Sequence, residues 1–439
     1  MIQGKRTTTV LHTLPNGVRL LAIPMPHVQS ASVGVFLRVG SRDETPANNG
    51  ISHVLEHMAF KGTATRSVQA INLDAERLGA DVNAFTGKDT TAYFMTGLGR
   101  HAAQLTRMTA DIVLNSTFPD VELQRELEVI RQEAIEYEED PQDCSSELLD
   151  RAVWGDDPMG MPVIGTVANI EGFTRHDVVR HVQSHYVAEK TVVAAAGNFD
   201  VEAWIALATD LFAAMPASAD LPALRTPAPA AYIGQPLAKR FTQVSQVFLN
   251  LAFPLAPAQQ EEISQQRWRL TAALAANLFG GGMSAPLVDT VREQLGLAYT
   301  AHSTVDSGDV WANFVVHAVT TPDKLDALVT ATGDLLRAQA AGIDPVHLER
   351  AKNQLTVSRV RAAERTYATM EQAVEEVFAS GTMTSMTEAL AMIEGISADE
   401  VRAVFERMLR NPPALAITGK GVSARTAQRL SACLLAGAR

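Results

Sequence analysis

The sequence repeats one pattern twice, and this repeat restricts the fold more than any other feature does. Four stretches of the first half have counterparts in the second half, with the same order of apolar, helical and glycine-rich segments. A chain built in this way is expected to fold into two related domains, because each copy can form the same helices and strands. The four pairs are Ser32–Ser41 with Val244–Phe253, Ile51–Thr63 with Leu270–Gly282, Ala75–Thr86 with Arg292–Ser303, and Pro119–Glu133 with Asp344–Ser358.

Each copy is expected to contain both strands and helices. The order in each half is three strands, two helices, two strands and two helices, followed by a last strand at Lys190–Asp200 or Pro413–Lys420. This order predicts the α+β class, with two homologous domains that are each a mainly antiparallel sheet covered by helices. Residues 214–240 are rich in Pro and Ala and lack periodicity, which is typical of a linker. The predicted domains are residues 1–213, expected to carry the metal, and residues 241–439.

The composition is that of an ordinary globular protein. Of the 439 residues, 46% are hydrophobic and 20% are charged, and the net charge is -12. This acidic balance argues against a nucleic-acid binder, which needs a basic surface. Two distant cysteines, Cys144 and Cys433, do not indicate a disulfide framework. No run reaches the roughly 18 apolar residues of a membrane span, and no leader pattern opens the sequence. A cytoplasmic protein without membrane or nucleic-acid partners is expected; the periplasm is not excluded.

One group of ionisable residues occurs in the first copy of the repeat alone. His53, Glu56 and His57 interrupt an apolar run, and the alignment places alanines opposite all three. Glu126 and Glu133 likewise fall opposite uncharged residues. Ionisable groups on an apolar helix are costly to bury unless they share a partner. If the fold itself needed them, the second copy would need them too, so the asymmetry favours a functional site in the first copy.

The spacing of the two histidines is typical of a metal site. His53 and His57 are four residues apart, so a helix places both imidazoles on one face. Two imidazoles and a carboxylate suit Zn²⁺, which in catalytic sites keeps a further position for water. Glu56 lies at the edge of the same face, where its carboxylate can accept a proton from that water. The order His-x-x-Glu-His is the inverted form of the commoner metalloprotease motif.

The third ligand has to come from elsewhere in the chain. An acidic helix is predicted over residues 121–137, and it carries Glu126 and Glu133. These two residues are seven apart, which is two helical turns on one face, so both can point into the same site. The spacing does not choose between them.

Other candidate motifs are weaker. His181 and His185 also lie four residues apart, but no glutamate lies between them, and a structural or surface role is favoured. The glycine-rich run at residues 279–284 lacks the Lys-Ser/Thr continuation of a phosphate-binding loop. The sequence contains no Gly-x-Ser-x-Gly nucleophile motif. The histidine–glutamate group is therefore the main candidate site.

Further motifs extend over nearly the whole chain: LPNGVRLL, GSRDE, HVLEHMAFKGT, NAFTGKDTTAYF, ELEVIRQEAIEYEEDPQD and REQLGLAYTAHS. With these motifs the chain resembles the pitrilysin-type zinc peptidases, specifically the short bacterial branch similar to mitochondrial processing peptidase. In this family the third zinc ligand is a glutamate about 75 residues past the second histidine, which corresponds to Glu133. A further glutamate, which supports the catalytic site in the family, corresponds to Glu126.

The resemblance also implies a substrate-binding part in each half. The family's Arg–Tyr pair, which binds the substrate backbone near the scissile bond, corresponds to Arg292 and Tyr299. Tyr299 is expected to donate a hydrogen bond to the developing oxyanion. Asn83 and Ala84 are expected on the strand that receives the peptide as an added strand. Residues 284–287 read Ser-Ala-Pro-Leu where relatives commonly have Ser-Ser-Arg-Leu, so specificity is not carried over.

The function implied by the resemblance is that of a zinc-dependent endopeptidase acting on peptides or unfolded segments. Glu56 is the expected general base. Related enzymes use four such domains to enclose a peptide chamber, so a dimer is expected. It is a homodimer or a heterodimer with a related chain, with the zinc of one subunit facing Arg292 and Tyr299 of the other. The competing hypothesis is a non-catalytic partner chain, or a core-like subunit of a respiratory complex; such relatives typically lose the ligands that are present here.

Overall fold

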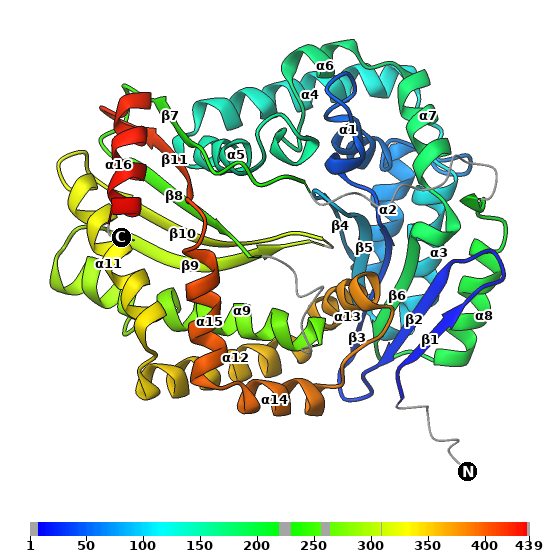
Figure 1. The fold of residues 1–439 in the computed structure, drawn as a ribbon. Helices are drawn as coiled ribbons and strands as arrows, with labels where there is room; N and C mark the ends of the chain where they lie inside the picture. The colour runs from blue at the N-terminus through cyan, green and yellow to red at the C-terminus, as the bar shows by residue number, and fades with distance from the viewer. Residues whose placement is uncertain (1–7, 219–229, 256–263, 309, 437–439) are drawn as a thin grey trace. The chain divides into compact units, whose positions relative to one another are not determined.

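Two β-sheets with matching strand orders are the centres of the fold (Figure 1). The structure is a computed structural model that describes residues 8–218, 230–255, 264–308 and 310–436. The first sheet contains β1 (Val10–Thr13), β2 (Arg19–Pro24), β3 (Ser30–Leu37), β4 (Asp81–Thr86), β5 (Thr91–Leu98) and β6 (Thr191–Gly197). The second contains β7 (Pro236–Arg240), β8 (Val247–Pro254), β9 (Thr300–Ser307), β10 (Ala312–Thr320) and β11 (Ala414–Gly419).

The order of the strands confirms the repeat. The first sheet runs β1-β2-β6-β3-β5-β4 and the second runs β7-β11-β8-β10-β9, so the second order equals the first without β1. Each sheet has a single parallel pair, β2 with β6 and β7 with β11, and its other pairs are antiparallel. The predicted α+β fold of two related, mainly antiparallel domains is thereby confirmed. The second sheet has one strand fewer than expected among the described residues.

The helices divide between two compact units. In the first unit lie α1 (Ile51–Met58), α2 (Val68–Leu78), α3 (Ala102–Leu114), most of α4 (Asp120–Glu139), α6 (Val167–Gly172), α7 (Arg175–His185), α8 (Val201–Phe212) and α13 (Thr366–Ser380). In the second lie α5 (Pro141–Trp154), α9 (Gln265–Gly280), α10 (Pro286–Val288), α11 (Leu325–Ala341), most of α12 (Pro345–Ala363), α14 (Met386–Gly395), α15 (Ala398–Met408) and α16 (Ala424–Ala436). Residues 289–294 form one π-helical segment.

Each unit takes one helix from the other half of the sequence. Helix α13 packs on β3 and β6 of the first sheet, where Met370 and Val374 join a buried apolar cluster with Phe36. Helix α5 packs on β8 and β11 of the second sheet in the same way. Since the opposite faces of the sheets are covered by other helices, central strands are buried on both sides, and all seven residues of β6 are buried.

The compact units are therefore not continuous in sequence. The first comprises Met1–Ile135, Pro162–Pro227 and Arg361–Met383, and the remaining residues form the second. The boundaries 1–213 and 241–439 describe the homologous halves and stay a prediction. Residues 219–229 of the predicted linker lie outside the described residues.

Two smaller expectations concern the cysteines and the membrane. Cys144 is buried and Cys433 is exposed, and both are free, as predicted. Within the part of the chain that the structure describes, none of the helices combines the length and the apolar character that a membrane crossing requires.

Candidate metal centre

Helix α1 separates its apolar residues from its ionisable ones. Ile51, Val54, Leu55 and Met58 are buried in the first core, at the i, i+3, i+4 and i+7 spacing of one helical face. His53, Glu56 and His57 lie off this face and are half-buried. Core packing therefore fixes the rotation of the helix and turns these three side chains out of the core.

The start of α1 is held by a buried carboxylate that the sequence reasoning did not single out. Glu44 is 2% exposed, and its Oε2 accepts hydrogen bonds from the Gly50 backbone N–H (2.8 Å) and Asn49 Nδ2 (3.0 Å). Its Oε1 accepts from the Ser52 backbone N–H at 2.9 Å. The first N–H groups of a helix lack acceptors within the helix. The N-cap residue Gly50 has no side chain to accept from them, so the Glu44 carboxylate supplies the acceptor. In the sequence, Glu44 is the last residue of the GSRDE motif, which indicated the family but no role for this glutamate.

The structure brings His53, His57 and Glu133 together. One candidate ligand atom from each lies within 4.8 Å of the other two. His57 Nε2 is 3.7 Å from Glu133 Oε2, and the imidazole centroids of His53 and His57 are 4.8 Å apart. Among the described residues, no other group of three His, Cys, Asp or Glu side chains is close enough to hold a metal. The helical spacing and the remote glutamate thus converge on one point.

Glu126 contacts the opposite nitrogen of the same imidazole. His57 Nδ1 lies 3.1 Å from Glu126 Oε2, and Lys61 Nζ is 2.7 Å from Glu126 Oε1. With its proton on Nδ1, His57 donates to Glu126 and turns the Nε2 lone pair toward Glu133. Burial raises the pKa of Glu126, but the hydrogen bonds from His57 and Lys61 outweigh burial, and the pKa lies below its ordinary value. Glu126 therefore favours its anionic form while in contact with His57. Lys61 was not anticipated.

The donor set fits a zinc ion. Burial lowers the pKa of His53 to about 4, with a smaller effect from His57, so this imidazole is neutral at physiological pH, as a ligand must be. His53 Nδ1 is buried without a hydrogen-bond partner in the structure. Two neutral imidazoles and one carboxylate are a ligand set found in catalytic zinc sites.

Glu56 lies beside this cluster with a perturbed carboxyl group. Burial raises its pKa, whereas hydrogen bonds with Thr86 and the charge of His57 act in the opposite direction. The charges of His57 and Glu133 also act on this carboxyl group, in opposite directions. A carboxylate whose proton affinity is increased in this way is suited to accept and return a proton.

The strand expected to receive a peptide lies at an edge of its sheet. β4 pairs only with β5, which leaves one side of β4 without a neighbouring strand in the described sheet. Asn83 is exposed, Ala84 is half-buried, and the Ala84 N–H bonds to Asn83 Oδ1 at 2.8 Å. Thr86, at the end of this strand, contacts Glu56. The edge is therefore connected to the candidate base.

The Arg–Tyr pair lies in the second unit. Tyr299 is 77% exposed, and the guanidinium carbon of Arg292 is 6.0 Å from the centroid of its ring. Arg292 also contacts Met283 Sδ at 3.5 Å and Glu293 at 3.4 Å. The two side chains are thus near each other and accessible. Their role toward a substrate stays a prediction.

The second histidine pair does not form a metal centre among the described residues. The rings of His181 and His185 are 4.5 Å apart, but no third ligand joins them. His181 is buried and lies 3.4 Å from Ser52 Oγ, so it packs α7 against α1. The structural role favoured by the sequence agrees with this contact.

Comparison with known proteins identifies the family. Residues 19–167 match the family described as insulinase (peptidase family M16), and residues 172–355 match the peptidase M16 inactive domain. A relative named "Uncharacterized zinc protease" from Rickettsia bellii is 32% identical over 92% of this chain and 96% of its own length. "Uncharacterized zinc protease YmxG" from Bacillus subtilis is 30% identical over 92% of this chain and 97% of its own. The chain belongs to peptidase family M16, which confirms the predicted family, and the expected zinc cofactor agrees with the names of these relatives.

Solved structures share the fold at low sequence identity. A protease from Helicobacter pylori has a TM-score of 0.84 at 19% identity, covering 94% of this chain and 100% of its own. A structure described as a peptidase M16 inactive domain from Pseudomonas fluorescens has a TM-score of 0.83 at 19% identity, covering 95% and 98%. Complex III2 from Candida albicans contains a chain with a TM-score of 0.79, also at 19% identity, covering 97% and 99%. These likenesses concern the fold alone, which a protease, a peptidase M16 inactive domain and a chain of Complex III2 share.

Proposed function

We propose that this chain is a zinc-dependent endopeptidase that cleaves peptides or unfolded segments. The observation that carries the proposal is the cluster of His53, His57 and Glu133, whose ligand atoms lie within 4.8 Å of one another. The names of the zinc protease relatives support the metal and the reaction class.

The residues of the chain divide the work of peptide hydrolysis. His53, His57 and Glu133 would hold Zn²⁺, which would supply a Lewis acid for the scissile carbonyl and would lower the pKa of water toward neutral. Glu56 accepts the proton of the attacking water and delivers it to the leaving amine. Glu126 holds the His57 ring at Nδ1, and Lys61 holds Glu126 in turn, a role that these two contacts support.

The peptide is held by its backbone in this proposal. The free edge of β4 at Asn83 and Ala84 accepts it as an added strand, which gives affinity with little sequence preference. Arg292 and Tyr299 bind the backbone near the scissile bond, and the Tyr299 hydroxyl donates to the oxyanion. A dimer, of two copies or with a related chain, completes the chamber and brings this pair from the other subunit.

Metal analysis and one glutamate variant test the proposal. Purified protein should contain about one zinc per chain, as a site with three protein ligands requires. Glu56→Gln should keep the zinc and lower the cleavage of a fluorogenic peptide by about 10²–10⁴-fold. The matched control is Glu128→Gln on α4, whose side chain is 61% exposed, and it should cleave normally. Undiminished cleavage by Glu56→Gln would remove Glu56 from the role of base.

A non-catalytic subunit is the second candidate, because the fold is shared with a chain of a respiratory complex. If this candidate is right, the purified protein either binds no zinc, or binds zinc without cleaving peptides. In the second case, adding a related chain does not produce cleavage. The zinc content and the cleavage assay with and without a homologous partner separate the two functions.

A further inference from the structure

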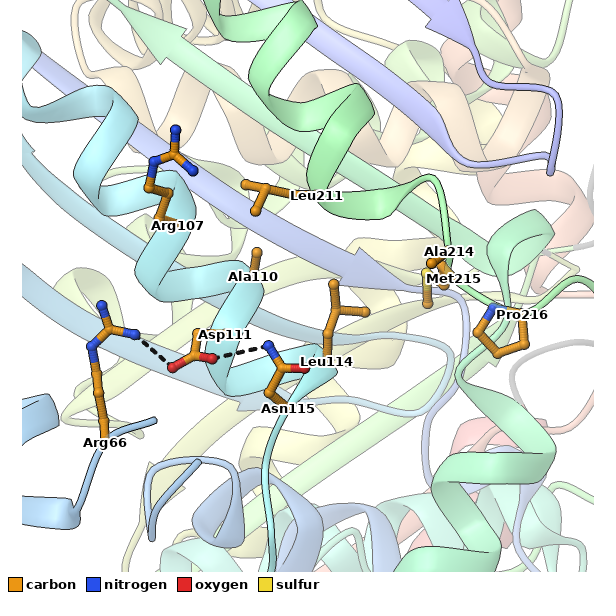
Figure 2. Close-up of a pocket in the computed structure, with 10 residues that line it drawn as sticks. All are labelled: Arg66, Arg107, Ala110, Asp111, Leu114, Asn115, Leu211, Ala214, Met215 and Pro216. Atoms are coloured by element: carbon orange, nitrogen blue, oxygen red, sulfur yellow. Dashed lines mark hydrogen bonds and ion pairs between the residues drawn. The ribbon is translucent and has the colours of Figure 1, made fainter. Parts of the chain in front are cut away.

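A cavity in the first unit lies apart from the residues of the metal centre. It has a volume of about 380 Å³, and it is formed by one face of α3, the end of α8 and the turn that follows (Figure 2). Its apolar wall consists of Ala110, Leu114, Leu211, Ala214, Met215 and Pro216. Its other lining residues, Arg66, Arg107, Asp111 and Asn115, are polar or charged. A cavity of this volume that combines an apolar wall with a few polar groups can bind a small organic molecule.

One of the two arginines in this cavity is neutralised by neighbouring acids. Arg66 donates to Asp111 at 2.6 Å and to Asp74 at 3.1 Å. Asp111 is itself fully engaged, because it also accepts hydrogen bonds from Asn115 Nδ2 and Thr63 Oγ1. Burial raises the pKa of Asp111, but these hydrogen bonds outweigh burial and hold the pKa below its ordinary value. Arg66 is therefore occupied by two carboxylates, and this group offers no free positive charge to a ligand.

Arg107 is the available charge. It lies one turn before Asp111 on α3, and Figure 2 draws interactions of Asp111 with Arg66 and Asn115 but none of Arg107. Within the described residues, no hydrogen bond or ion pair links Arg107 to another side chain. A guanidinium presents a planar fork that matches a carboxylate in two parallel hydrogen bonds.

The backbone at the end of α8 does not compete for Arg107. Asn16 Nδ2 donates to the carbonyl oxygens of Phe212 at 2.9 Å and of Met215 at 3.1 Å. Two carbonyl groups at the end of α8 and in the turn that follows therefore already have a donor. What remains at the cavity is an apolar wall with one unpaired cation beside it.

We propose that this cavity binds a small carboxylate carried on a short aliphatic body. Arg107 pairs with the carboxylate, and the body lies against Leu114, Leu211 and Met215. Two sources share this chemistry: a free aliphatic acid, and the C-terminal residue of a peptide. The proposal is independent of the peptidase function, since no lining residue belongs to the zinc cluster.

Calorimetric titration of the full chain with matched ligands tests the site. The probes are 4-methylpentanoate and N-acetyl-leucine, and their neutral controls are the two corresponding primary amides. The expected result is saturable binding of a carboxylate and at least about tenfold weaker binding of its amide, because a charge-assisted hydrogen-bond pair is lost. Tighter binding of N-acetyl-leucine identifies a peptide C-terminus as the source, and tighter binding of 4-methylpentanoate identifies a free acid.

Two arginine variants locate the binding. Arg107→Gln should weaken carboxylate binding about tenfold or more. Arg77→Gln, which changes an exposed arginine on α2 outside the cavity, should leave it unchanged. A carboxylate bound at the zinc ion would bind Arg107→Gln as tightly as the unmodified protein, and that result overturns the proposal. It is likewise overturned if neither acid binds, or if the amides bind as well as the acids.

Discussion

Replacing Glu44 with glutamine should loosen the start of α1 without changing the shape of the side chain much. The carboxylate accepts three hydrogen bonds, from the Gly50 and Ser52 backbone N–H groups and from Asn49 Nδ2, at 2.8, 2.9 and 3.0 Å. These donors reach it from both sides, two at Oε2 and one at Oε1. A glutamine has one oxygen, so in either orientation its NH₂ group faces at least one buried N–H.

The size of the effect follows from this mismatch. An unsatisfied buried donor costs about 1–3 kcal/mol. Glutamine also removes a buried charge, which offsets part of the cost; burial already raises the pKa of Glu44, although its hydrogen bonds oppose that shift. We expect the free energy of local opening at α1 to fall by roughly 1–3 kcal/mol, which is about a fivefold to 150-fold faster exchange of its amides.

Hydrogen exchange measured by mass spectrometry on peptides covering α1 tests this expectation. Exchange should be faster in Glu44→Gln than in the unmodified protein, and Glu128→Gln should match the unmodified protein, because its exposed side chain holds no buried donor. Zinc should restore part of the protection, because an ion bound by His53 and His57 stabilises the folded helix. If exchange in α1 is unchanged within twofold, the carboxylate does not hold the helix and the reasoning fails.

Two further predictions concern the metal and pH. Glu133→Gln should weaken zinc binding more than Glu126→Gln does, because the first removes a ligand and the second removes only a hydrogen-bond partner of His57. Loss of such a partner typically lowers metal affinity about 10–100-fold. Competition with a chelator measures both affinities, and the reverse order would exchange the roles of the two glutamates. Burial, helped by the neighbouring His302, lowers the pKa of His317 from 6.5 to about 4. The unfolded chain therefore binds more protons between these values, and stability should fall as the pH drops through this window, by up to roughly 3 kcal/mol. His317→Asn, whose amide nitrogen takes the place of Nδ1 and can keep the hydrogen bond to Asn250 Oδ1, should lose less stability in acid, as urea titrations at pH 7 and pH 4.5 would show; an equal loss would contradict the assignment to His317.

The repeat and the histidine spacing were readable from the sequence because both depend on local order. Strands and helices form from neighbouring residues, so a repeated pattern predicts a repeated sheet, and the shared strand order agrees with it. The four-residue spacing of His53 and His57 is likewise a property of one helix. The assignment of ligands and base to this cluster remains a prediction for metal analysis and kinetics.

Other features depend on contacts between residues that are distant in sequence, and no local sequence pattern predicts them. Glu126 and Glu133 share a face of α4, so spacing alone left the third ligand open. Only packing of α4 beside α1 places Glu133 at Nε2 of His57 and Glu126 at Nδ1. The role of Glu44 was not predictable from a local pattern either, because it depends on the segment before α1 folding back against the start of that helix.

What the sequence determined by itself is the set of parts: two copies of one α+β pattern and a helix with two histidines and a glutamate on one side. The tertiary structure decided which copy uses which helix, since α13 covers the first sheet and α5 the second. The physical reason is that an amphipathic helix specifies only that its apolar side must be buried. Which sheet buries it depends on the path of the whole chain.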